Sequence, residues 1–280
     1  MKSFALVIFL SAAAASGQDL SGFTKVLLPV FTKSDAAGAN GSRFFTVLTA
    51  AVDPDLPLKY YPATGDVIIG GQAGIGEMVH QQGFNIFAAV AGESGRLLYI
   101  DANVADHVTF SYWLSSTARG SANRPLETEL PVVRERDFLT GRTYVSGLPN
   151  RPIIEGAANG QGTLAGYATR SRFRVYDVDN SGTLSVHLKL FYRFAEDGSV
   201  TPLYETDVIA DRRDFNDPSY PFYGQIDLPN YCSGSANPLL PCVALESLSL
   251  QITPNTNARY WAFVSSTDNV TQQVRIHHPQ

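Results

Sequence analysis

Short segments in which apolar and polar residues alternate constrain the fold of this chain more than any other feature. Most segments after the N-terminus alternate in twos, as in Arg43–Val52 and Thr183–Phe191, and turn residues follow them at short intervals. No segment carries an apolar stripe of helical spacing longer than two turns. This pattern predicts an all-β fold of packed sheets and excludes the alternating strand–helix order of α/β enzymes.

Two segments that contain the tryptophans are similar to each other. Val108–Thr117 and Arg259–Asn269 each contain Tyr-Trp followed by Ser-Ser-Thr. Leu-Pro-Val precedes each of them, at residues 28–30 and 130–132. Such an internal repetition is typical of two related β-modules in tandem.

The segment Ser115–Arg124 is rich in Ser, Ala, Gly and Asn, a composition typical of a linker. It divides the chain after the first of the two similar segments. We therefore predict two tandem immunoglobulin-like β-sandwich modules, the first at residues 18–120 and the second at residues 121–280.

The first 17 residues have the composition of an export signal. Lys2 supplies the positive charge, Phe4–Leu10 the apolar core, and Ala15-Ser16-Gly17 a cleavage site before Gln18. The apolar run is too short to span a bilayer. The sequence thus predicts a signal peptide at residues 1–17 and a secreted or periplasmic protein with no stable membrane insertion.

The charge of the chain excludes one class of partner. It contains 21 Lys and Arg against 26 Asp and Glu, a net charge of −5, and the charges are scattered. Proteins that bind nucleic acid or anionic lipid through charge need a basic patch or stripe. We therefore expect no nucleic-acid partner.

The two cysteines, Cys232 and Cys242, enclose a short loop rich in Ser, Asn and Pro. In an exported protein such a pair is most simply a disulfide. Closing so short a loop stabilises a fold by about 2–3 kcal/mol. We predict a Cys232–Cys242 disulfide with a structural role.

Several motifs together resemble a known group of proteins. They are Lys25–Val30, Gly41–Phe44, Leu130–Phe138, Arg172–Asp177 and Trp261–Gln272. With these motifs the chain resembles uncharacterised secreted β-rich proteins of soil bacteria of the acidobacterial type. The resemblance covers most of the chain after residue 17 and implies an extracellular β-rich protein. It implies no catalytic residues, because none are established for that group.

The segment from Asp177 to Gly182 contains a possible calcium motif. Asp177, Asp179 and Ser181 match the first half of a calcium loop, but its twelfth position is Leu188 where an EF-hand has Glu. A hairpin turn that uses Asn and Gly for positive φ explains the same residues. The sequence leaves both interpretations open: a calcium site at Asp177, Asp179 and Ser181, or a turn.

A row of three arginines, Arg170, Arg172 and Arg174, lies on one face of a predicted strand. We predict that this strand, Arg170–Tyr176, forms a hairpin with Thr183–Phe191. The arginine row is then either a solvated face that pairs across the hairpin or an anion site. The catalytic motifs G-x-S-x-G and H-E-x-x-H are absent from the sequence. No catalytic residue is therefore assigned.

The long irregular segment from Asp211 to Tyr231 is the strongest candidate for binding, because long loops in compact domains often carry function. Its aromatic rings alternate with Asn and Asp, which could stack on sugar rings and bond their hydroxyls. Alternatively, the aromatics cap the open edge of a sandwich. The candidate ligand-binding residues are Asp214, Phe215, Asn216, Asp217, Tyr220, Phe222, Tyr223 and Tyr231.

Three functions agree with these patterns. The first is a secreted, non-catalytic β-sandwich protein that binds an extracellular partner, a glycan or a cell-surface protein. The second is an exported hydrolase that acts on polysaccharide with acids from the segment Asp211–Asp217. The third is a structural component of a surface or matrix. Calcium is the one cofactor that the sequence leaves open.

Overall fold

The computed structural model describes residues 19–30, 36–37, 43–52, 56, 58–61, 76–78, 84–85, 94–117, 126–155, 163–192, 199, 201–233, 243–244 and 247–279. The predicted signal peptide at residues 1–17 lies outside these ranges. None of the helical turns within them has the length and apolar character needed to cross a membrane.

The described residues form strands and two short 3₁₀ turns, η2 (Ala105–His107) and η3 (Glu135–Asp137). Neighbouring strands run antiparallel in all four large sheets. The prediction of an all-β fold is therefore confirmed. We number the large sheets I to IV in the order in which they stack.

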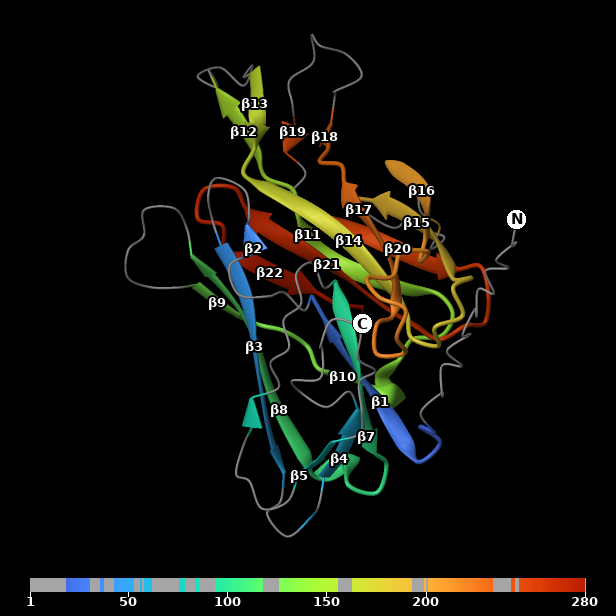
Figure 1. The fold of residues 1–280 in the computed structure, drawn as a ribbon. Helices are drawn as coiled ribbons and strands as arrows, with labels where there is room; N and C mark the ends of the chain where they lie inside the picture. Colours follow the sequence, from blue (N-terminus) through green and yellow to red (C-terminus); the bar gives the residue numbers. More distant parts are fainter. Residues whose placement is uncertain are drawn as a thin grey trace, which may run out of the picture.

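Sheets I and II form the first sandwich (Figure 1, blue and green). Sheet I comprises β2 (Ala36–Ala37), β3 (Arg43–Val52), β8 (Val108–Thr117) and β9 (Leu126–Glu129), with β6 (Phe84–Asn85) paired to β3. Sheet II comprises β10 (Val133–Arg134), β1 (Phe23–Pro29), β7 (Gly95–Asp101), β4 (Leu58–Tyr61) and β5 (Gly76–Met78). Leu48 and Tyr112 of sheet I share one buried cluster with Leu98 and Ile100 of sheet II.

Sheets III and IV form the second sandwich (Figure 1, light green to red). Sheet III comprises β17 (Phe222–Leu228), β14 (Thr169–Asp177), β21 (Tyr260–Asp268) and β22 (Val274–His277). Sheet IV comprises β11 (Thr143–Pro149), β20 (Ser247–Pro254), β15 (Ser185–Phe191) and β16 (Tyr204–Ile209). Two separate ribbons are β12 (Pro152–Glu155) with β13 (Thr163–Tyr167), and β18 (Cys232–Ser233) with β19 (Val243–Ala244).

Sheet II is buried on both of its faces. Leu98 faces sheet I, whereas its neighbours Leu97 and Tyr99 belong to a further cluster with Trp261 and Phe263 of sheet III. The four sheets therefore stack in the order I, II, III, IV. This explains why four consecutive residues of β7, Leu97–Ile100, are apolar, since a strand covered on both faces needs no polar side.

Backbone pairing crosses the module boundary that the sequence predicts after residue 120. β9 pairs with β8 in sheet I, and β10 pairs with β1 in sheet II. The residues that follow the predicted linker thus complete the first sandwich. The division into modules at residues 18–120 and 121–280, and their immunoglobulin-like character, stay predictions.

The interpretation of residues 170–191 as a hairpin is wrong. β14 pairs with β17 and β21 in sheet III, whereas β15 pairs with β16 and β20 in sheet IV. The turn between them is an arch that leads from one sheet of the sandwich to the other. Phe173 of β14 and Leu188 of β15 both face the core between those sheets. An arch therefore requires the same alternation of apolar and polar residues in its two strands as a hairpin does.

Candidate functional site

The loop between β16 and β17 is docked on sheet II. The Ser219 carbonyl accepts a hydrogen bond of 2.7 Å from the Leu97 backbone N–H. The Tyr220 side chain is only 4% exposed, and the Arg96 guanidinium lies 4.1 Å from its ring centre. The loop thus connects the second sandwich to the first.

The two carboxylates that the hydrolase hypothesis uses are held within this junction. Asp214 accepts a hydrogen bond of 2.7 Å from the Ser94 backbone N–H, and Asp217 accepts one of 2.7 Å from the Tyr61 hydroxyl. Burial, and then the hydrogen bond to Asp217, raise the pKa of Tyr61 well above its ordinary value, so the phenol stays a donor. Both carboxylates therefore have structural partners in the first sandwich.

The aromatic residues of the predicted binding loop do not form one exposed platform. Phe215 is 42% exposed and its ring lies 4.9 Å from that of Tyr220. Phe222 is half-buried beneath the Arg213 guanidinium, at 5.0 Å, and Tyr223 packs into the cluster between the sandwiches. Tyr231 packs instead against the core of the second sandwich.

Asn216, between Phe215 and Asp217, is exposed. The structure thus brings the residues from Asp214 to Tyr223 together and places Tyr231 elsewhere. The packing is that of the alternative interpretation, in which the aromatics cover a sandwich edge. A ligand-binding role for these residues stays a prediction.

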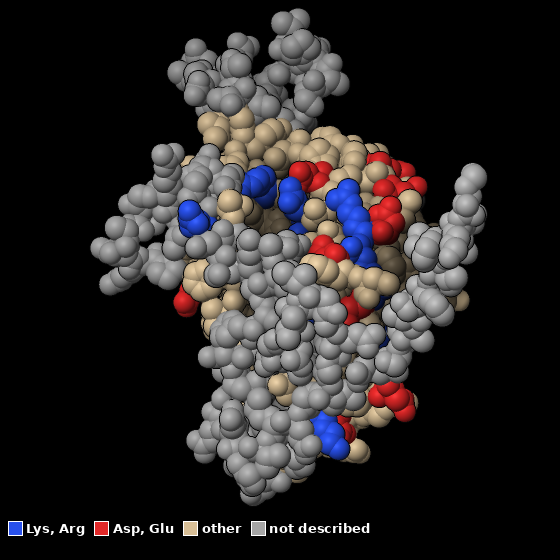
Figure 2. Space-filling view, in the orientation of Figure 1, with Lys and Arg blue, Asp and Glu red and all other residues tan. Residues whose placement is uncertain are grey.

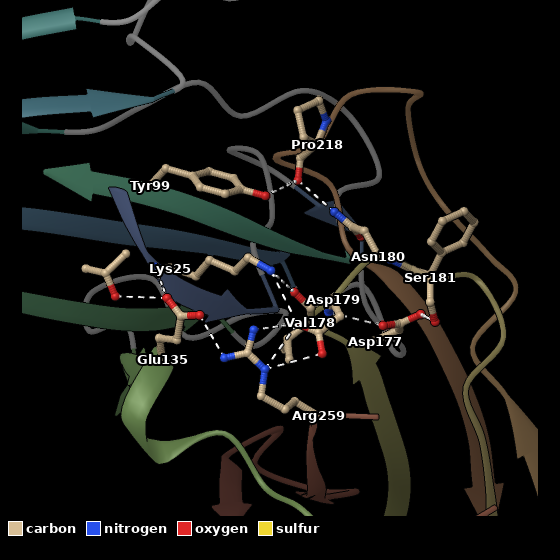
Figure 3. Close-up of polar contacts among 12 residues, drawn as sticks. Lys25, Tyr99, Glu135, Asp177, Val178, Asp179, Asn180, Ser181, Pro218 and Arg259 are labelled. Atoms are coloured by element: carbon tan, nitrogen blue, oxygen red, sulfur yellow. Dashed lines mark hydrogen bonds and ion pairs between the residues drawn. The ribbon is translucent and has the colours of Figure 1, made fainter. Parts of the chain in front are cut away.

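The oxygens of the calcium motif do not converge on one point (Figure 3). The buried carboxylate of Asp177 accepts hydrogen bonds from the Ser181 hydroxyl and the Gly182 backbone N–H, both at 2.7 Å. The Asp179 carboxylate faces away from these groups and pairs with Arg259 at 2.6 Å. Positive φ angles at Asn180 and Gly182 allow the arch to bend.

No cluster of three or more His, Cys, Asp or Glu suited to a metal ion is present among the described residues. The contacts of Asp177 are those of a turn. A calcium site at Asp177, Asp179 and Ser181 stays a prediction.

Arg259 lies at the centre of an ion-pair network between the two sandwiches (Figure 3). Its guanidinium pairs with Glu135 at 2.7 Å and with Asp179 at 2.6 Å. Glu135 also accepts hydrogen bonds from Thr24 and from the backbone N–H of Lys25, both in β1. Burial alone would raise the pKa of Glu135, but these hydrogen bonds and the Arg259 charge outweigh it and lower that pKa.

The predicted disulfide falls at the limit of the described residues. The backbone of Cys232 pairs with that of Ala244 across the β18–β19 ribbon. Cys242 lies outside the described residues. The Cys232–Cys242 disulfide therefore stays a prediction.

A cleft of about 430 Å³ lies where the two sandwiches meet. Its floor is the face of sheet III that points away from sheet IV, with Arg170, Arg172 and Arg174 from β14 and hydroxyl residues from β21. Its walls include Phe44 and Leu114 from sheet I. Figure 2 shows Lys and Arg side chains gathered beside a hollow on this face of the molecule.

The three arginines of the floor have different partners. Arg172 holds Asp227 of β17 with two hydrogen bonds, at 2.7 and 3.2 Å. Arg170 donates to the side-chain oxygens of Asn269 and Gln272. The hydrogen bond from Arg172, together with its charge, lowers the pKa of Asp227 despite partial burial, so this carboxylate stays ionised.

Arg174 occupies the inner end of the cleft. It donates to the Ser94 carbonyl at 3.2 Å and to the Gln225 side chain at 2.9 Å, and its Nε atom is buried with no hydrogen-bond partner. Val30, which follows β1, lines the same end with a φ of 60°, a strained value for a β-branched residue. Its backbone N–H also donates to the Tyr176 hydroxyl of β14 at 3.2 Å, which connects the first sandwich to this end of the floor.

Sequence reasoning identified the arginine row but missed the cleft. The spacing of two places Arg170, Arg172 and Arg174 on one face of β14, as the sequence predicts. No pattern in the sequence of β14 indicates that residues of sheet I lie opposite the arginine row. The row is neither a simple solvated face nor paired along a hairpin.

No family model matches this chain, and the search of curated proteins gives no match. Among solved structures, the chain is similar to one described as "Enterococcal surface protein, partial N-terminal region". The similarity covers 94% of this chain and 91% of that chain, with 10% sequence identity and a TM-score of 0.23. A TM-score this low supports no conclusion about fold or function.

Proposed function

We propose that this chain is an exported, non-catalytic protein that binds an extracellular glycan or cell-surface partner in the cleft between its two sandwiches. The cleft is the observation that carries the proposal. Its volume of about 430 Å³ falls within the range of ligand sites, about 300–1,000 Å³. Its polar groups stand on strands of sheet III, and side chains on such rigid elements hold a ligand in a defined position.

The lining of the cleft favours binding over hydrolysis. Paired-acid hydrolysis of a glycan needs two carboxyl groups about 5–10 Å apart. Among the described residues that line the cleft, Asp227 is the one carboxylate, and Arg172 holds it. Asp214 and Asp217, the other candidate acids, are engaged between the sandwiches.

Retention on insoluble polymers tests the proposal. Residues 18–280 are incubated with a panel of polysaccharides and bacterial cell walls, with and without calcium, and reducing sugar is assayed in the same tubes. We expect retention on at least one polymer and no release of sugar. Substitution Phe44→Ala in the wall is expected to weaken retention, whereas Phe215→Ala on the loop is not.

Release of reducing sugar that is lost in Asp214→Asn or Asp217→Asn would favour the hydrolase. Absence of retention on every polymer, together with self-association that increases with concentration, would favour a structural component. Dependence of retention on calcium would direct attention to Asp177 and Asp179.

A further inference from the structure

We infer that the ligand of the cleft is an acidic polysaccharide that lies along β14 and is held through its carboxylates by Arg170 and Arg174. The inference rests on the proposed function, because it assigns a ligand class to the same cleft. Four observations carry it: the charge of the floor, the spacing of the two arginines, the hydroxyl row beside them and the apolar walls.

The floor carries more positive than negative charge. Among the described residues that line the cleft, three guanidiniums face a single carboxylate, Asp227, which leaves a net charge of +2. Within the described part of the chain, the partners of Arg170 and Arg174 are neutral amide and carbonyl oxygens. A guanidinium has five N–H donors in a planar fork that matches a carboxylate. Both arginines therefore keep donors for an anionic ligand.

The spacing of the two arginines indicates an extended ligand. Arg170 and Arg174 are four residues apart on β14, which corresponds to about 13 Å at the rise of a strand. Arg172, between them, is already neutralised by Asp227. One carboxylate or phosphate group cannot reach both ends. A ligand that binds both arginines must therefore carry at least two separated negative charges, as an acidic polysaccharide does along its chain.

The surroundings of the arginines fit sugar units. Ser265 and Thr267 of β21 lie directly opposite Arg172 and Arg170, so hydroxyl groups run beside the arginine row. Phe44 forms part of the opposite wall, and an aromatic side chain suits the apolar face of a sugar ring. A sugar acid has the required combination of carboxylate, hydroxyl groups and apolar ring face.

The charge of the whole chain argues against nonspecific electrostatic binding of any polyanion. Its net charge is −5, so long-range attraction for nucleic acid or another highly charged polymer is weak. The positive charge is confined to a cleft with apolar walls. Recognition there requires a ligand whose anionic groups are carried on a partly apolar body.

Affinity electrophoresis tests this inference. Residues 18–280 are run in native gels that contain polygalacturonate, its fully methyl-esterified form, dextran or polyglutamate. We expect retardation by polygalacturonate and none by its ester, which has the same backbone without the charge. Retardation is expected to weaken as salt rises from about 50 to about 200 mM.

Variants connect the retardation to the cleft. Arg170→Gln and Arg174→Gln are each expected to lower the affinity at least about tenfold, because a charged, forked hydrogen bond is lost. Arg170→Lys keeps the charge and is expected to retain part of the affinity. Arg136→Gln removes the same charge at an exposed pair with Asp106 outside this cleft and is expected to change nothing. Near-ultraviolet circular dichroism checks that each variant is folded.

The outcomes of these experiments distinguish failure of the acidic-ligand inference from failure of the proposed glycan binding. Equal retardation by polygalacturonate, its ester and dextran, unchanged in the arginine variants, overturns the acidic ligand and leaves glycan binding intact. Equal retardation by polyglutamate shows unspecific charge attraction and also overturns it. No retardation by any polymer, and no retention on the insoluble panel, overturns both.

Discussion

At the scale of single residues, one glycine sets how closely the two sheets of the second sandwich approach at their edge. Gly224 lies in β17 of sheet III, beside β16 of sheet IV. A Cβ atom at this position would lie 2.4 Å from the Ile209 carbonyl oxygen and 2.8 Å from a Val208 methyl group. The nearest contact is with backbone, which cannot rotate away as a side chain can.

Gly224→Ala is therefore expected to lower the free energy of unfolding by about 1–3 kcal/mol, the usual cost of overpacking. Urea denaturation followed by fluorescence measures the change. Gly22→Ala is the matched control, because a Cβ atom there meets nothing within 4 Å. Similar effects for both substitutions would contradict the close approach at Gly224.

At the scale of elements, the positions of strands are predictable from the sequence but their partners are not. Alternation is a local property, and it places β14 and β15 correctly on either side of residues 178–184. The same alternation suits a hairpin or an arch, so it does not distinguish the two arrangements. Which sheet a strand joins depends on contacts between residues far apart in the chain.

The candidate site is likewise predictable from the sequence only where it depends on local spacing. The row from Arg170 to Arg174 follows from a spacing of two, a local signal. The wall residues Phe44 and Leu114 come from β3 and β8, and no sequence pattern connects them to β14. The burial of Tyr220 on Arg96 likewise depends on a long-range contact. The sequence of a loop rich in aromatics and carboxylates therefore does not indicate that much of the loop packs between the sandwiches.

The ion-pair network of Arg259 connects β1, η3 and the arch, and we expect its contribution to stability to decrease in acid. Burial alone would raise the pKa of Glu135 and Asp179. Hydrogen bonds from the Lys25 backbone N–H and from Arg259 outweigh burial at Glu135, and Arg259 does so at Asp179, so both pKa values are lowered. A carboxyl group whose pKa is lower in the folded state stabilises the fold above its unfolded pKa, and this contribution disappears as pH falls through the folded pKa. The ordinary values are 4.5 for Glu135 and 3.8 for Asp179, so the loss occurs below these values.

Arg259→Gln is expected to lower the urea midpoint at pH 7 and to make stability depend less on pH between about 5 and 3. Urea denaturation at several pH values measures both effects. Arg136→Gln breaks an ion pair whose two side chains are 65% and 74% exposed, so it is expected to leave the midpoint unchanged. An unchanged pH profile in Arg259→Gln would show that the network contributes nothing to folding.

At the scale of the whole molecule, the four stacked sheets make one body. Sheet II packs on sheet I through one face and on sheet III through the other. β9 and β10 tie the middle of the chain to the first sandwich, and Thr128 of β9 donates to the Val274 carbonyl of β22. The cleft with its arginines exists only because the sandwiches are fixed against each other in this way.

Calorimetric unfolding of residues 18–280 tests this arrangement most directly. If the two sandwiches form one cooperative unit, heating gives a single transition whose calorimetric and van't Hoff enthalpies agree. Two separate transitions, each with its own enthalpy, would show that the sandwiches fold and move independently. A cleft between independent units could not hold Arg170 and Arg174 against its opposite wall, and the proposed binding site would then be wrong.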